Sequence, residues 1–178
     1  MIANPPQLHM KHRLTNLPEL TVPSGYSLRA MRPDELPVWV ALLNDNGELG
    51  EWDLERADGV FRGGQRVPYD GCFFITRDGE PVATAQLTLH HDGPYAPMPE
   101  LGWVAASPGH RGHGLGSVAT LAVLHHAVAA GYRELFLLTD DHRLPALNIY
   151  FKLGFEPWIV DATAPERWAK VEQALGRW

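Results

Sequence analysis

The stretch that decides the fold reads Ala105-Ala106-Ser107-Pro108-Gly109-His110-Arg111-Gly112-His113-Gly114-Leu115-Gly116. An apolar run at 101–106 leads into it, and a long run rich in Ala, Val and Leu at 117–130 leads out. Glycine tolerates positive φ and lets a backbone approach a ligand closely. A strand, a glycine loop and a helix start, in that order, direct backbone N–H groups at a phosphate. We therefore expect an anion-binding turn here.

Two familiar phosphate loops do not fit the glycine spacing. A P-loop needs Lys and then Ser or Thr directly after its last glycine, whereas Gly114 is followed by Leu115 and Gly116. A dinucleotide-binding G-x-G-x-x-G that starts at Gly112 needs a glycine where Ser117 stands. A nucleotide-binding oxidoreductase is therefore a remote alternative.

The glycines do fit the pattern Gln/Arg-x-x-Gly-x-Gly/Ala, read as residues 111–116. Downstream, after an apolar strand-like run at 133–140, Ala146-x-x-x-Tyr150-x-x-x-Gly154-Phe155 forms a second motif. In this order and spacing, the two motifs resemble those of the GNAT family of N-acetyltransferases, and the resemblance covers about residues 25–160. Many family members carry Asn three residues before that alanine. This chain has Arg143 there, so a contact made by that Asn cannot be carried over.

The rest of the pattern agrees with that family's architecture. The Asp78-Gly79 pair between two apolar runs predicts a hairpin turn, because it supplies the positive φ values that such turns need. Strands are expected at 26–32, 70–77, 81–90, 100–106, 133–140 and 155–160, and helices at 34–44, 53–61, 116–130, 144–153 and 165–175. The order β-α-α-β-β-β-α-β-α-β predicts an α/β fold with a GNAT-like mixed, mostly antiparallel sheet flanked by helices. We expect an N-terminal arm at 1–23, ordered only if it packs on something, and a single domain at 24–178.

Composition narrows the class of protein. The chain has 178 residues, 45% of them hydrophobic and 20% charged, which suits one domain with a sizeable core. The net charge of -6 argues against a broad nucleic-acid surface. No apolar run approaches the roughly 20 residues of a membrane helix, and the N-terminus lacks an apolar signal core, so we expect a cytoplasmic protein. The only cysteine, Cys72, lies in an apolar run and reads as a buried structural thiol. The sequence leaves open whether the protein forms a homodimer.

The resemblance implies that acetyl-CoA is the acyl donor. Backbone amides of the glycine loop and the helix start would hold its pyrophosphate; these cofactor-binding positions are Arg111, Gly112, His113, Gly114, Leu115, Gly116 and Ser117. In the family, the preceding strand runs beside the pantetheine arm, and by resemblance those positions are Val104, Ala105 and Ala106. A tight turn without a ligand is the alternative for the loop.

Proton transfer needs an acid and a base. By resemblance, Tyr150 is the candidate general acid for the coenzyme A thiolate; a core tyrosine with its hydroxyl at the rim is the alternative. Glu100, at the start of the strand before the loop, is the first candidate base, acting directly or through water. His90, His91 or solvent could serve instead. The histidine clusters lack a His-Glu-x-x-His motif and a cysteine pair, so no metal site is expected.

These residues predict an N-acetyltransferase that moves an acetyl group from acetyl-CoA to a primary amine by direct attack. A non-catalytic acyl-CoA binding or sensing module on the same fold is the alternative, because a fold does not determine an activity. The acceptor, a small-molecule or peptide amine, should enter between segments 44–68 and 91–99. The first segment is rich in acids, which could favour a cationic amine or form a solvated face.

Overall fold

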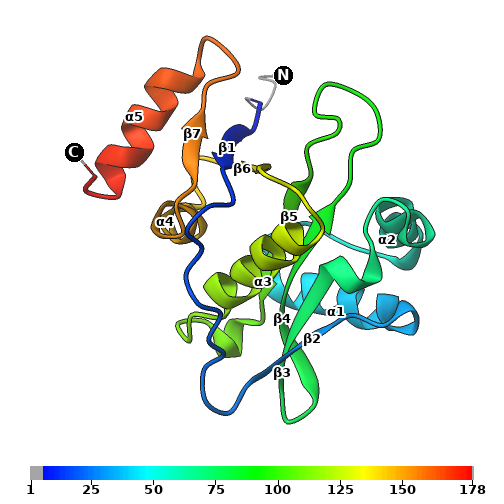
Figure 1. Cartoon of the computed structure of the whole chain (residues 1–178). Coiled ribbons are helices and arrows are strands. Elements are labelled where there is room, and N and C mark those ends of the chain that lie inside the picture. The colour runs from blue at the N-terminus through cyan, green and yellow to red at the C-terminus, as the bar shows by residue number, and fades with distance from the viewer. Residues whose placement is uncertain (1–5, 178) are drawn as a thin grey trace.

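A computed structural model describes residues 6–177; residues 1–5 and 178 lie outside the description. Within that range the chain forms an open seven-stranded sheet with strand order β2-β3-β4-β5-β6-β1-β7 (Figure 1). The strands are β1 (Leu8–His12), β2 (Ser27–Ala30), β3 (Cys72–Arg77), β4 (Glu80–Thr88), β5 (Glu100–Ala106), β6 (Leu135–Thr139) and β7 (Glu156–Trp158). Only β5 and β6 pair in parallel; the other neighbours are antiparallel. The predicted mixed, mostly antiparallel sheet is confirmed.

Helices cover both faces of the sheet, as Figure 1 shows. They are α1 (Leu36–Asn46), α2 (Leu54–Phe61), α3 (Leu115–Ala129), α4 (Leu144–Lys152) and α5 (Ala164–Ala174). The first two share a core with β3 that is built around Trp39, Phe61 and Phe74. Helices α3, α4 and α5 share the other core with β1 and β6. Helix α3 is apolar on most sides because the sheet and α4 enclose it.

The N-terminal segment is the main departure from the expected layout. Residues 8–12, which the sequence suggested as part of an arm, form β1 inside the sheet, between β6 and β7. Leu8 and Met10 are fully buried, so this short strand contributes to the core. The His12 ring accepts a hydrogen bond from the Leu14 N–H at Nδ1 (2.8 Å) and donates one to the Leu153 carbonyl from Nε2 (2.9 Å). The segment is therefore anchored to the C-terminal half of the chain.

Two irregularities in β5 shape the middle of the sheet. Against β4, Thr84 pairs with Ala105 and Gln86 with Gly102, so β5 carries one extra residue. This bulge holds Trp103 at φ 50, in the left-handed region, and its indole packs edge to face on Trp52 with ring centroids 4.5 Å apart. Against β6, β5 pairs only at Glu100 and Leu101. Beyond these residues the two strands diverge and leave a wedge.

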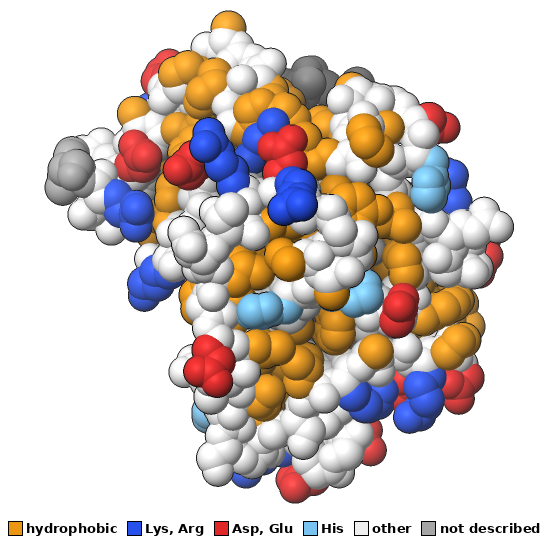
Figure 2. Space-filling model, in the orientation of Figure 1, with side chains coloured by type: hydrophobic (Ala, Val, Ile, Leu, Met, Phe, Trp, Pro, Cys, Tyr) orange, Lys and Arg blue, Asp and Glu red, His pale blue; other side chains and the backbone are white. Residues whose placement is uncertain are grey.

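Charged side chains of both signs are interspersed over the face drawn in Figure 2. This face therefore has no broad basic patch of the kind that nucleic acids bind. No helix within residues 6–177 has the length and apolar character needed to cross a membrane.

Candidate active site

A cavity of about 170 Å³ lies in the wedge between β5 and β6. Its lining residues come from both strands, from α4, from the segment before β1 and from the segment after α1: Gln7, Leu49, Glu100, Leu101, Gly102, Trp103, Val104, Leu138, Thr139, Arg143, Ala146 and Tyr150. Three residues predicted for different tasks, Glu100, Val104 and Tyr150, thus border one space. The other predicted positions, 105–106 and 111–117, do not line it.

The glycine loop leads from β5 to the start of α3. Gly114 is the N-cap of α3 at φ 74, and no side chain within the described residues caps the helix. The first bond inside the helix runs from the Val118 N–H to the Gly114 carbonyl (3.1 Å), so the N–H groups of residues 115–117 have no helical acceptor. A Cβ built on Gly114 would meet no atom within 4 Å. The three amides therefore lie at the positive end of the helix dipole, and the space beside Gly114 is open.

Gly116 serves packing. A Cβ at this position would lie 3.2 Å from Ile149 Cδ1 and 3.9 Å from Val104 Cγ1. The missing side chain lets the first turn of α3 approach both α4 and β5. The glycine loop and the wedge are therefore joined through direct contact at this point.

The end of α1 and the segment after it border the wedge, where Leu49 lines the cavity. Asn46 donates a hydrogen bond to the Ala106 carbonyl (2.9 Å), one of the backbone groups expected beside the pantetheine arm. Arg111 donates to the Asn46 carbonyl (2.8 Å) and pairs with the Glu48 carboxylate (3.1 Å). Arg143 bonds the Glu48 carbonyl (3.1 Å) and the Asp140 carboxylate (2.8 Å). The two arginines thus tie this segment to the glycine loop and to the start of α4.

Tyr150 lies in α4 and is 7% exposed. Burial raises the pKa of its phenol to about 12, and the neighbouring Arg143 guanidinium offsets only part of that effect. The phenol is therefore protonated throughout the physiological range. It can donate a proton or hydrogen bond to an anion that forms in the cavity.

Glu100 contacts one of the two histidines named as alternative bases. Its Oε2 lies 2.8 Å from His90 Nε2, and the side chains are 18% and 17% exposed respectively. His91 points elsewhere and bonds the Gln65 carbonyl (3.0 Å). The structure therefore brings Glu100 and His90 together as a pair and leaves His91 apart.

Nine of the twelve lining residues were not among the site residues expected from the sequence, and these include Gln7, Trp103 and Arg143. Gln7 reaches the cavity because β1 pairs with β6, and no local sequence pattern predicts this pairing. Arg143 occupies a motif position, so its place in the family pattern was a usable signal. Trp103 turns toward the cavity at the bulge, and strict alternation along β5 does not predict a bulge.

A wedge between β5 and β6 beside a glycine loop at a helix N-terminus is the arrangement that the sequence predicted for an acyl-CoA-dependent transferase. A sequence model described as the acetyltransferase (GNAT) family matches residues 28–155. The chain belongs to this family, whose members use acetyl-CoA as acyl donor.

Individual relatives agree with that assignment. A mycothiol acetyltransferase of Thermomonospora curvata is 35% identical over 154 residues, covering 82% of this chain and 49% of the relative. A GCN5-related N-acetyltransferase from Kribbella flavida has a TM-score of 0.62 at 26% identity, covering 86% of this chain and 55% of that one. AAC(6')-Iy, solved with the bisubstrate analogue CoA-S-monomethyl-acetylneamine, shares the fold with a TM-score of 0.63 at 21% identity, covering 78% of this chain and 96% of that one. The chain spans about half the length of the curated relatives it matches.

Proposed function

We propose that this protein transfers an acetyl group from acetyl-CoA to a primary amine of a small molecule. A single domain, residues 24–178, would carry the activity, with β1 completing its sheet. One observation supports the proposal most: Glu100 and Tyr150 border the same cavity, at the point where β5 and β6 diverge. One carboxylate and one phenol in a shared space are the two proton-handling groups that direct aminolysis of a thioester requires.

The reaction follows from these positions. The amides at the start of α3 hold the pyrophosphate, and the thioester lies in the wedge. Glu100 takes a proton from the acceptor ammonium, directly or through a water molecule. The free amine attacks the thioester carbonyl carbon, and the carbon–sulfur bond breaks. Tyr150 donates its proton to the departing thiolate, the new amide nitrogen loses its second proton to solvent, and the phenolate regains a proton from solvent.

The acceptor class is inferred from the relatives and the cavity. Several relatives bear the name mycothiol acetyltransferase, which directs attention to small-molecule amines. The small volume of the cavity suits the reacting end of such a molecule, with the apolar Leu49 and Trp103 on its border. A peptide amine is the second class to test.

Release of the coenzyme A thiol, measured with acetyl-CoA and a panel of amines, tests the proposal. The panel should contain glucosamine, putrescine, kanamycin, an amino-acid ester, a peptide with a free N-terminus and the acceptor of the mycothiol acetyltransferases. Amine-dependent thiol release is the expected result. Tight acetyl-CoA binding without turnover on any amine would favour a non-catalytic acyl-CoA sensor.

A further inference from the structure

We propose that His90 is a positioning residue for Glu100. The inference rests on the proposed function, because it assigns His90 a task in removing the acceptor proton. His90 Nε2 and Glu100 Oε2 are 2.8 Å apart. An ionised carboxylate can only accept, so the ring nitrogen donates its N–H. The bond engages one carboxylate oxygen and leaves Oε1 to accept a proton.

Aromatic contacts on two sides hold the His90 ring in place. Its centroid lies 5.4 Å from that of Phe136 on β6 and 5.8 Å from that of Tyr95 in the loop after β4. Tyr95 in turn stacks on Phe136, with centroids 4.6 Å apart and planes inclined by 25°. The imidazole therefore sits in an aromatic corner that limits its rotation.

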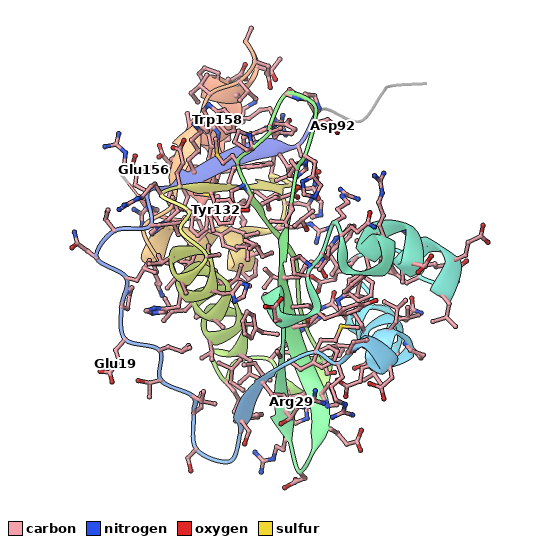
Figure 3. All side chains as sticks on the ribbon, turned by 45° about the vertical axis from the view of Figure 1, so that its right-hand side comes forward. Glu19, Arg29, Asp92, Tyr132, Glu156 and Trp158 are labelled. Carbon is pink, nitrogen blue, oxygen red and sulfur yellow. The ribbon has the colours of Figure 1, made fainter. Side chains whose placement is uncertain are left out.

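A residue of the N-terminal strand β1 holds Tyr95 in place beside the His90 ring. The Tyr95 hydroxyl lies 2.7 Å from His9 Nε2, and His9 Nδ1 lies 3.0 Å from the Gln7 carbonyl. The carbonyl can only accept, so Nδ1 carries the hydrogen, and Nε2 of the neutral ring accepts from the tyrosine hydroxyl. Figure 3 shows the loop, marked by Asp92, rising beside β1 and the labelled Trp158. His9 thus secures the loop residue that orients His90.

The pair is shielded enough for the contact to matter. Each side chain is less than one fifth exposed, so water screens the bond only partly. Within residues 6–177, His90 is the only side chain that forms a hydrogen bond with Glu100. Without it, the carboxylate would be free to rotate away from the acceptor. His90 keeps its own proton, and the ammonium proton moves to Glu100 Oε1 directly or through water.

Three single variants and one double variant distinguish the effect of the His90–Glu100 hydrogen bond from the effect of His90 ring packing. His90→Phe keeps an aromatic ring in the corner and removes the donor; we expect kcat to fall about 10- to 100-fold, with the KM for acetyl-CoA within about twofold. His90→Gln restores a side-chain N–H donor and should recover most of the rate. Glu100→Gln should be slow, and adding His90→Phe should slow it no further. Rates are measured with saturating acetyl-CoA and the fastest amine of the panel.

The control is His125→Phe on α3; among the described residues the His125 ring hydrogen-bonds only the Pro18 carbonyl (2.9 Å). The inference is overturned if His90→Phe keeps the parent kcat, if His90→Gln is as slow as His90→Phe, or if Glu100→Gln is fully active. A parent that acetylates no amine refutes the proposed function itself, and the inference with it. An active parent with an active His90→Phe refutes the positioning role alone.

Discussion

Replacing Gly114 by alanine tests whether the start of α3 binds the cofactor pyrophosphate. Gly114 has φ 74, and an added Cβ would meet no protein atom within 4 Å. The cost to folding is then the left-handed backbone alone, roughly 1–2 kcal/mol. The methyl group would, however, stand where a phosphate must approach the free amides. Loss of one hydrogen bond to a charged group costs about 1.5–3 kcal/mol, so the Kd for coenzyme A should rise at least about tenfold.

Gly79 supplies a matched control. It lies in the hairpin turn between β3 and β4 at φ 88, and an added Cβ there also meets nothing within 4 Å. Gly79→Ala should therefore lose a similar free energy of unfolding in urea and keep its affinity for coenzyme A within about twofold. Calorimetric titration with coenzyme A compares the two variants with the parent. An unchanged Kd in a folded Gly114→Ala variant would refute the assignment of the phosphate site.

Three further predictions follow from buried groups. Tyr150→Phe should lower kcat by about 10²- to 10⁴-fold with little change in the Kd for coenzyme A; a rate within twofold of the parent would make the residue structural. Burial raises the pKa of the Cys72 thiol to about 12, so the native protein should not react with a thiol reagent at pH 8 until it is unfolded. Burial also lowers the pKa of His12 below its usual value of about 6.5, so the unfolded chain takes up a proton first. Stability should be highest above about pH 6.5 and fall on acidification, by up to about 1.4 kcal/mol per pH unit for this group. In urea titrations, the free energy of unfolding of His12→Gln should therefore decrease less steeply on acidification than that of the parent. A smaller decrease should remain, because burial also lowers the pKa of His9. An equally steep decrease in the variant would contradict the assignment.

The sequence was most informative where local rules determine the structure. Glycine spacing after an apolar strand predicted the loop and the start of α3, because positive φ at Gly114 is a property of the residue itself. The Asp78-Gly79 turn likewise predicted the β3–β4 hairpin. These two features and the motif around Tyr150, through their resemblance to the GNAT pattern, predicted the architecture apart from β1.

Contacts between residues far apart in the chain could not be predicted from the sequence. Residues 8–12 are too few and too mixed in character to predict a strand on their own, and they form one because β6 and β7 offer open edges. The sequence offered Glu100, His90 and His91 as rival bases, since the distances among them depend on how the loop after β4 folds back. Only the structure shows that the first two form a pair and that His91 turns toward Gln65.

The place of β1 in the sheet has a consequence for how the chain acquires its structure. Strand β1 pairs with residues 135–139 and 156–158, which are synthesised more than 120 positions after it. Its partners are synthesised only after β2 to β5, so one half of the sheet closes late, whereas β2 to β5 can pair earlier as antiparallel neighbours. Contacts of such long sequence separation slow folding and leave the apolar side chains of Leu8 and Met10 exposed until those contacts form. Gln7 directly precedes β1 and His9 lies on it, so pairing of β1 completes the cavity lining and the support of Tyr95 in the loop after β4 together.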